Sequence, residues 1–354
     1  MVKYLALPVF TLPISVSLRF TTFHSTLSVV LLALLCFGCR PDTADPTTTA
    51  PAAPPKLNLP PVPVPAFNAD SAYQYVAGQV AFGPRVVNSQ AHAATREYLV
   101  GKLKAFGAEV TEQTFSADAY DGTRLNGTNI IGRYNPEMAD RILLAAHWDT
   151  RHVADSPLED DPAAVVDGAD DGASGVGVLL EIARQLGQSL PNIGVDIVFF
   201  DAEDYGESGG GEVETWGLGA QHYSRNISTT KPRYGILLDM VGAKDARFAI
   251  EGVSQRFAPQ IVEKVWNLAG GISRFAPYFP KTEGRAITDD HYFVNTIARI
   301  PMVDIINFRG DTETGFVAHW HTDEDDMDVI DRGTLQAVGQ VVTAVVYREG
   351  NGSL

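Results

Sequence analysis

The sequence is poor in cysteine, in basic side chains and in long apolar runs. Cys36 and Cys39 are its only cysteines, so the chain beyond them forms no disulfide and is stabilised by its core and by any bound metal. Lysine and arginine number 27 against 43 acidic residues, a net charge of −16. No basic stripe is present to neutralise phosphates, which excludes a nucleic-acid-binding protein. The apolar stretch 27–38 is too short to span a bilayer comfortably.

This apolar stretch indicates a targeting segment. Lys3 and Arg19 precede it and Gly38-Cys39 ends it, which gives it the flanks of a secretory signal. A leucine-rich core followed by Gly-Cys resembles a bacterial lipoprotein signal, in which the cysteine is lipidated and becomes the first mature residue. We therefore expect residues 1–39 to be a lipoprotein signal segment lipidated at Cys39, with simple cleavage or a retained anchor as alternatives. The mature protein is then exported, periplasmic or anchored to the outer membrane, and meets the membrane only through its lipid.

The segment that follows is dominated by proline. Nine of the 26 residues from 40 to 65 are proline, and there are too few apolar side chains to pack, which predicts a semi-extended, disordered linker. No internal repeat and no second linker divides the rest of the chain. We therefore predict one folded domain over residues 66–349 and a short tail over residues 350–354.

Residues 66–349 alternate between strand-like and helix-like patterns. Near-continuous apolar runs at 195–202 and 234–242 are typical of strands buried on both faces, and further strands are predicted at 109–115, 128–134, 141–147 and 301–307. Helical periodicity predicts helices at 70–82 (with Asp70 as N-cap), 89–107, 172–186, 254–269 and 331–349. This alternation predicts an α/β fold, a single domain with a mostly parallel mixed central sheet flanked by helices on both faces.

Five side chains with metal-binding chemistry follow these predicted strands or lie at the mouth of a helix: His147, Asp171, Asp204, Asp239 and His321. Open parallel sheets bind ligands at the carboxyl ends of their strands, so we expect the five to converge on one cleft. Two imidazoles and three carboxylates form a nitrogen and oxygen site of the kind that suits zinc. The sequence therefore predicts a zinc site at this edge of the sheet.

Three of these positions have a neighbour with a similar group. Asp170 or Asp171 could simply cap the following helix, and Asp171 is the better candidate for a ligand. His319 competes with His321 for the same role, and His321 is favoured. Glu203 directly precedes the ligand candidate Asp204. Adjacent acids at a strand end point in different directions, so one can bind metal while the other carries protons.

Seven segments together carry a family resemblance: FGPRVVNSQAH (82–92), AHWDTR (146–151), DGADDGASGVGVLLEIARQL (167–186), FFDAEDYGE (199–207), ILLDMVGA (236–243), TDDHYF (288–293) and HWHTDEDDMDVID (319–331). In this order they resemble the bacterial glutaminyl-peptide cyclotransferases, a family with the zinc-aminopeptidase-like fold. The resemblance spans about residues 70–348. It implies an acyltransferase that converts the N-terminal glutamine of peptides and proteins to pyroglutamate and releases ammonia.

The resemblance also implies roles for particular residues. It implies one zinc ion per chain, with the ligands Asp171, Asp204 and His321. It implies that Glu203 is the general base and acid of catalysis. It also implies that Asp239 and Asp289 belong to the hydrogen-bonded network of acids around Glu203. It implies that Ile287, Phe316 and Trp320 form an apolar pocket for the substrate side chain. It implies that Trp216 lines the entrance of this pocket.

The main alternative is an aminopeptidase that removes N-terminal residues with two zinc ions and a water nucleophile. His147 and Asp239 would then be ligands of a second ion, whereas in a cyclotransferase they are hydrogen-bonding neighbours of the first. The aromatic residues around the site favour the cyclotransferase. A binding lipoprotein without catalysis is the third interpretation, and the intact Glu203 argues against it. We expect a monomer whose partners are peptides and proteins with N-terminal glutamine.

Overall fold

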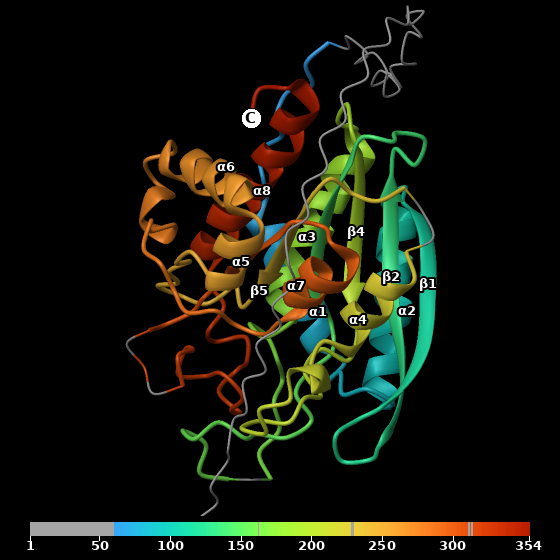
Figure 1. Ribbon diagram of the computed structural model, residues 1–354, viewed down its shortest axis with the longest axis vertical. Coiled ribbons are helices and arrows are strands. Elements are labelled where there is room, and N and C mark those ends of the chain that lie inside the picture. Colours follow the sequence, from blue (N-terminus) through green and yellow to red (C-terminus); the bar gives the residue numbers. More distant parts are fainter. Residues whose placement is uncertain (1–59, 162, 228–229, 311, 313) are drawn as a thin grey trace, which may run out of the picture. The chain divides into compact units, whose positions relative to one another are not determined.

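A six-stranded sheet forms the centre of the domain (Figure 1). The computed structural model describes residues 60–354 except 162, 228–229, 311 and 313, so the predicted signal segment with Cys39 and most of the predicted linker lie outside the described residues. The strands are β1 (Glu109–Asp118), β2 (Arg124–Tyr134), β3 (Arg141–His147), β4 (Gly194–Phe200), β5 (Gly235–Asp239) and β6 (Met302–Ile306). Across the sheet they lie in the order β1-β2-β4-β3-β5-β6.

Parallel pairing holds the part of the sheet that carries the candidate site. Strand β3 pairs in parallel with β4 and with β5, and β5 pairs in parallel with β6. Strand β2 joins β1 and β4 in antiparallel pairs. The carboxyl ends of β3, β4, β5 and β6 therefore lie at one edge of the sheet, and the prediction of a mostly parallel mixed sheet is confirmed.

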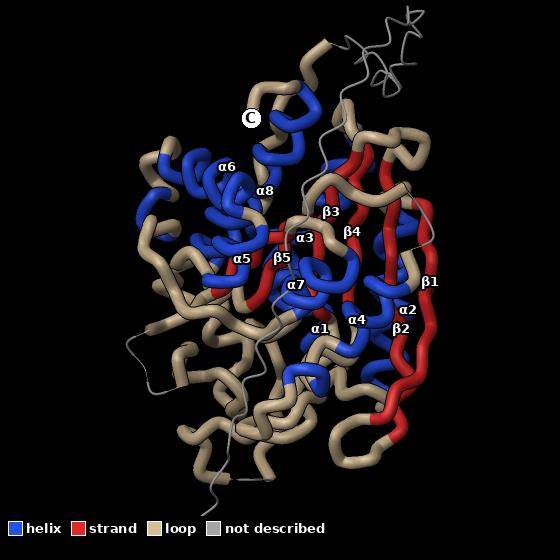
Figure 2. Tube along the Cα trace, in the orientation of Figure 1, coloured by secondary structure: helices blue, strands red, loops and turns tan. Residues whose placement is uncertain are grey.

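Helices lie in front of and behind the strands (Figure 2). They are α1 (Ala69–Val80), α2 (Gln90–Ala105), α3 (Ala173–Gln188), α4 (Leu218–Arg225), α5 (Gly252–Phe257), α6 (Pro259–Gly270), α7 (Asp290–Phe293) and α8 (Arg332–Asn351). Strand β3 shows why both faces need cover. Its residues Ile142, Leu144 and Ala146 belong to the core built with α1, α3 and α8, whereas Leu143 and Ala145 belong to a second core with α4 and α7. Successive side chains point to opposite faces, so both faces are buried.

Two helices differ from the sequence predictions. The helix predicted over 254–269 is in fact α5 followed by α6, because Pro259 occupies the first turn of α6 and its ring cannot continue α5. Asp70 is not the N-cap of α1. Asn68 has that position, and its side chain accepts a hydrogen bond from the backbone N–H of Ser71.

Residues 60–66 pack on the last helix and its surroundings. The backbone N–H and C=O of Val62 both bond to the Asn351 side chain, at 2.8 and 2.9 Å. Gln340 donates to the Pro65 carbonyl at 3.0 Å. The chain is therefore held against α8 before the predicted start of the domain at Ala66. Among the helices that the structure describes, none has both the length and the apolar character needed to cross a membrane.

Candidate active site

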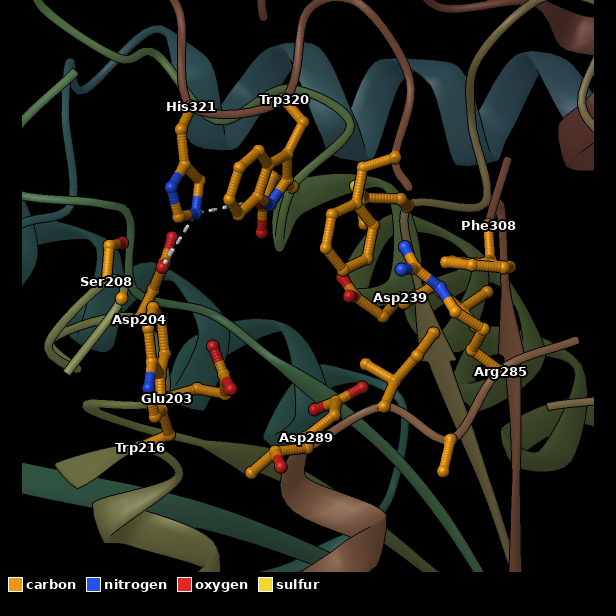
Figure 3. Close-up of a pocket in the computed structure, with 18 residues that line it drawn as sticks. Glu203, Asp204, Ser208, Trp216, Asp239, Arg285, Asp289, Phe308, Trp320 and His321 are labelled. Carbon is orange, nitrogen blue, oxygen red and sulfur yellow. Dashed lines mark ion pairs between the residues drawn. The ribbon is translucent and has the colours of Figure 1, made fainter. Parts of the chain in front are cut away.

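The candidate residues gather where the parallel strands end. His147 is the last residue of β3, and Asp239 is the last residue of β5. Glu203 and Asp204 lie in the loop that leaves β4, and Asp171 lies two residues before α3. His321 joins them from the loop before α8 (Figure 3). The structure thus brings together the five metal-binding side chains that the sequence singles out, and it places Glu203 beside them.

One group of atoms suits a metal ion. His321 Nε2 lies 3.1 Å from an Asp204 oxygen and 3.9 Å from an Asp171 oxygen. All three side chains are buried, and their donor atoms lie within 4.8 Å of one another. The second Asp204 oxygen is buried without a hydrogen-bond partner. A zinc ion takes such oxygen and nitrogen ligands at about 2.0–2.2 Å, so the donor set fits this metal.

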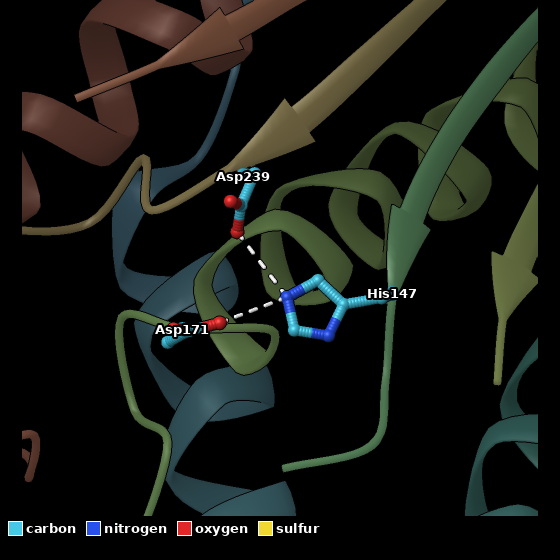
Figure 4. Close-up of side chains that lie close together, drawn as sticks. All are labelled: His147, Asp171 and Asp239. Atoms are coloured by element: carbon cyan, nitrogen blue, oxygen red, sulfur yellow. Dashed lines mark hydrogen bonds and ion pairs between the residues drawn. The ribbon is translucent and has the colours of Figure 1, made fainter. Parts of the chain in front are cut away.

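A second group shares Asp171 with the first. His147 Nε2 lies 2.9 Å from an Asp171 oxygen and 3.2 Å from an Asp239 oxygen (Figure 4). The three side chains are buried, and their donor atoms also lie within 4.8 Å of one another. This group can act as a hydrogen-bonded triad beside one metal ion, or it can hold a second ion.

Two aspartates hold the backbone of the site in place, and sequence reasoning gave neither of them a role. The two Asp149 oxygens accept the backbone N–H groups of Glu203 and Asp204, both at 3.1 Å. The two Asp325 oxygens accept those of Asp170 and Asp171, at 2.7 and 3.1 Å. Both side chains are fully buried. Each carboxylate therefore fixes a pair of neighbouring residues: Glu203 and Asp204 both line the pocket, whereas of Asp170 and Asp171 only Asp171 does.

The competing candidates Asp170 and His319 face each other. His319 Nε2 lies 3.0 Å from one Asp170 oxygen, and the other Asp170 oxygen accepts the backbone N–H of Gly242 at 2.7 Å. Neither residue belongs to a group of described side chains that could hold a metal ion. Their contacts connect the loop before α3, the end of β5 and the loop before α8.

His321 is oriented by the ion pair of Asp155 and Arg151, in which Arg151 is buried and the Asp155 side chain is 22% exposed. The His321 Nδ1 lies 2.8 Å from an oxygen of Asp155, which also pairs with Arg151. Arg151 donates to the Asp204 carbonyl at 2.8 Å and lies 4.9 Å above the Trp216 ring. A histidine whose one nitrogen is fixed in this way presents the other to a metal. Arg151 occurs in the AHWDTR segment, but nothing in the spacing identifies Asp155.

Glycine makes close packing possible at the start of α3. Gly172 has φ +89°, and a Cβ there would lie 2.9 Å from the His147 ring. A Cβ on Gly175 would lie 2.3 Å from the Leu238 carbonyl oxygen. A side chain at either position would push α3 and Asp171 away from the ends of β3 and β5.

The pocket above these groups has a volume of about 380 Å³ and an aromatic wall. Trp320 stacks on His321 with ring centroids 3.7 Å apart and on Phe316 at 4.8 Å. Phe308, which the sequence did not single out, meets Phe316 edge to face at 5.9 Å. The four residues that the resemblance placed around the substrate all line this pocket: Trp216, Ile287, Phe316 and Trp320.

Glu203 and Asp289 are buried among other acids of the pocket, and this favours the neutral forms of these two side chains. Burial raises the pKa of Glu203 well above its usual value, and the charges of Asp289, Asp290 and Asp204 raise it further. Burial also raises the pKa of Asp289. Glu203, Asp204 and Asp289 face the pocket together (Figure 3). A carboxyl with a raised pKa can take up and release a proton near neutral pH.

The sheet, the helices on both its faces and the candidate metal-binding groups at its carboxyl edge give the protein the fold of the zinc-dependent exopeptidases. A sequence model of peptidase family M28 matches residues 129–346, and the chain belongs to this family. The predicted resemblance to bacterial glutaminyl-peptide cyclotransferases is confirmed by solved structures.

Three relatives illustrate the similarity. The glutaminyl cyclase of Bacteroides thetaiotaomicron is 51% identical, with a TM-score of 0.77, over 80% of this chain and 99% of that chain. A Zn-dependent exopeptidase from Parabacteroides distasonis is also 51% identical, with a TM-score of 0.78 and the same coverage. A glutaminyl-peptide cyclotransferase of Drosophila melanogaster is 26% identical over 73% of this chain and 75% of that protein. Because cyclase and exopeptidase both occur among these names, the chemistry of the site has to separate them.

Proposed function

We propose that this protein is a zinc-dependent glutaminyl-peptide cyclotransferase, which converts the N-terminal glutamine of peptides and proteins to pyroglutamate and releases ammonia. The observation that carries the proposal is the aromatic wall beside the buried Glu203. Trp320 packs between Phe316 and His321, so the apolar wall reaches the metal-binding group. The methylene groups of a glutamine side chain can pack on this wall while its carboxamide meets the polar atoms.

The proposed metal site consists of Asp171, Asp204 and His321. A zinc ion held there supplies a Lewis acid that polarises the γ-carboxamide of the substrate. We assign His147 and Asp239 to hydrogen bonding beside this ion and expect one zinc per chain. The Asp239 carboxylate lies 3.2 Å from His147 Nε2, so these two side chains can pair with each other beside the ion, and burial raises the pKa of Asp239.

Glu203 is the proposed proton carrier. The α-amine of the substrate forms a bond to the γ-carboxamide carbon, and the bond from that carbon to the amide nitrogen breaks. Glu203 accepts the proton that the α-amine loses and donates it to the leaving nitrogen, which departs as ammonia. Asp289 supports this role because its charge raises the pKa of Glu203. Asp239 connects this group of acids with His147, whose Nε2 lies 3.2 Å from an Asp239 oxygen.

The tryptophans restrict the access of water to the reacting atoms. Trp216 lines the pocket at the side of Asp204 and Ser208, away from Phe308 (Figure 3). Its ring lies 6.4 Å from that of His321. With a glutamine side chain between Trp216 and Trp320, the α-amine of the same residue is the nearest nucleophile. Cyclisation then competes well with hydrolysis.

A two-zinc aminopeptidase is the second candidate, and one observation favours it. His147, Asp171 and Asp239 form a complete second group of possible ligands, with Asp171 placed to bridge two ions. In such an enzyme a water molecule held between two metals attacks the peptide bond. The two proposals therefore differ in metal content and in product.

One pair of measurements separates them. Incubated with a glutamine-initiated peptide, the zinc-loaded protein should release ammonia and lower the peptide mass by one ammonia. It should leave a leucine-initiated peptide of otherwise identical sequence uncut. Elemental analysis of the same sample should give about one zinc per chain. Release of free leucine, with two zinc ions and no cyclisation of the glutamine peptide, would establish the aminopeptidase instead.

A further inference from the structure

The pocket is lined by five carboxylates, and one arginine stands among them. The acids are Asp171, Glu203, Asp204, Asp239 and Asp289. Among the described residues that line the pocket, Arg285 is the only lysine or arginine. Figure 3 shows Arg285 with Phe308 on the opposite side of the pocket from Asp204 and Trp216. The proposed chemistry at Glu203 and the zinc site does not use it.

The exposed Arg285 side chain has no acidic partner among the described residues, and its guanidinium lies against an aromatic ring and a glycine. The guanidinium lies 5.2 Å from the centroid of the Phe308 ring. On another side it packs against Gly315, where a Cβ would lie 2.0 Å from an Arg285 nitrogen. Gly315 has φ +84°, so both its backbone and its lack of a side chain suit this close contact. No described residue forms an ion pair or a side-chain hydrogen bond with Arg285, and its N–H donors remain available to a ligand.

The backbone that carries Arg285 is fixed on both sides. The Arg285 carbonyl accepts the backbone N–H of Gly252 at 3.0 Å, and Gly284 donates to the Ile250 carbonyl at 2.7 Å. The backbone N–H of Ile287 bonds to the Glu251 carboxylate at 2.8 Å. Arg285 therefore stands at a set position relative to Ile287 in the pocket wall. The fixed backbone and the contacts with Phe308 and Gly315 restrict where the guanidinium can reach, which lowers the entropic cost of binding a ligand there.

The charge pattern indicates what Arg285 binds. Arg285 is the one fixed positive charge among the described residues of the pocket lining, and it stands across the pocket from Asp204 and Trp216, so a negatively charged group that follows the N-terminal residue finds its partner there. We propose that Arg285 binds a carboxylate that directly follows the first residue of the substrate, which makes it a specificity-determining residue. This carboxylate belongs either to the side chain of an acidic second residue or to the C-terminus of a dipeptide. The inference rests on the proposed cyclisation of N-terminal glutamine.

The test compares peptides that differ only in this charge. One arm measures kcat/KM for Gln-Glu-amide against Gln-Gln-amide, and the other compares the dipeptide Gln-Ala with Gln-Ala-amide. In at least one arm the native protein should prefer the carboxylate roughly 10-fold, as a charge-assisted hydrogen bond allows. Arg285→Gln should abolish that preference and leave kcat/KM for the neutral peptides nearly unchanged. Arg285→Lys should keep only part of it, because lysine lacks the planar fork.

The control is Arg256→Gln. Arg256 is also exposed, its guanidinium also lies over an aromatic ring, that of Phe257 at 5.3 Å, and it does not line this pocket. This variant should retain the full preference. If Arg285→Gln loses the preference only in the first arm, Arg285 binds the side chain of an acidic second residue. If it loses the preference only in the second arm, Arg285 binds the C-terminal carboxylate of a dipeptide. If the native protein and Arg285→Gln show the same ratio of kcat/KM between the carboxylate peptide and its neutral counterpart in both arms, the inference is wrong.

A binding measurement keeps this outcome separate from the proposed activity. Titration calorimetry should show tighter binding of pyroglutamyl-Glu-amide than of pyroglutamyl-Gln-amide to the native protein, and similar binding of the two to Arg285→Gln if an acidic second residue is the ligand. For the C-terminal carboxylate the pair is pyroglutamyl-Ala and its amide. If the native protein cyclises no glutamine peptide but this discrimination holds, the proposed function fails and the carboxylate site stands.

Discussion

Glu203 is the residue on which the proposed chemistry depends most directly. Changing it to glutamine removes the proton carrier and leaves a side chain of the same shape, so we expect turnover of a glutamine peptide to fall by at least about 100-fold. The proposed metal-binding side chains Asp171, Asp204 and His321 are untouched, so we expect zinc content to stay at the native level. Steady-state kinetics and elemental analysis of the same preparation check both statements.

The exposed Glu214 provides a control for the Glu203 substitution. Glu214→Gln changes the charge by the same amount close to the Trp216 segment and should keep native turnover. If Glu203→Gln turned over substrate nearly as fast as this control, another group would have to carry the proton.

Asp289 gives a prediction about pH. Glu203 has to be ionised to accept a proton, so activity is lost as the pH falls through its pKa. The negative charge of Asp289 raises that pKa. Asp289→Asn removes the charge and keeps a side chain that can cap α7. The acidic limb of kcat/KM should therefore move to lower pH, by about one unit. A limb that stays in place or moves to higher pH would contradict the assigned coupling.

At the scale of secondary-structure elements, helix α3 owes its position to a glycine. Gly175→Ala would place a Cβ 2.3 Å from the Leu238 carbonyl oxygen on β5 and 2.9 Å from the Ala146 side chain on β3. We expect the free energy of unfolding to fall by about 1–3 kcal/mol. Zinc affinity should fall as well, because Asp171 lies two residues before the helix. Denaturant unfolding and metal titration measure the two effects.

Gly101 in α2 is a matched control for Gly175. A Cβ there meets nothing within 4 Å, so Gly101→Ala should leave the protein unchanged or stabilise it by about 0.5–1 kcal/mol through helix propensity. Equal free energies of unfolding for the two alanine variants would show that α3 does not depend on the close contact.

The sequence predicts the elements whose pattern is local and misses those whose cause lies elsewhere in the chain. The apolar runs of β4 and β5 predict buried parallel strands, and the acids after them predict a site at the carboxyl edge. The split between α5 and α6 could have been read from Pro259. The five-residue π-helix Val294–Ala298 has no such local signal.

The same limit applies within the site. Four of the metal-binding candidates are recognisable because each ends or follows an apolar strand or lies at the start of a helix, whereas His321 lies in the loop between β6 and α8 and stands out through the HWHT segment. Asp149 acts on Glu203 across 54 residues, and Asp155 acts on His321 across 166. No spacing in the sequence connects such partners. They become visible only when the fold has brought them within hydrogen-bond distance.

At the scale of the whole molecule, we propose that the protein is an exported lipoprotein anchored through Cys39. The proline-rich segment after Cys39 would then hold the catalytic domain away from the membrane surface. Cys39→Ser should shift the protein from the membrane fraction to the soluble fraction of cells, while Cys36→Ser should leave it membrane-bound. Fractionation followed by immunodetection distinguishes them. Retention of Cys39→Ser in the membrane fraction would refute the lipid anchor.

The Asp149 carboxylate has a consequence for redesign. It holds the backbone of Glu203 with one oxygen and that of Asp204 with the other, so an engineer cannot move the proton carrier and the adjacent metal-binding residue independently. The residues that face the substrate come from two loops, and each loop also carries a group of the reactive centre: Ile287 precedes Asp289 in the loop before α7, and Trp320 precedes His321 in the loop before α8. Exchanging either loop to accept other peptides would therefore move a reactive group as well. Single side-chain substitutions are the way to change selectivity while the reactive centre keeps its dimensions.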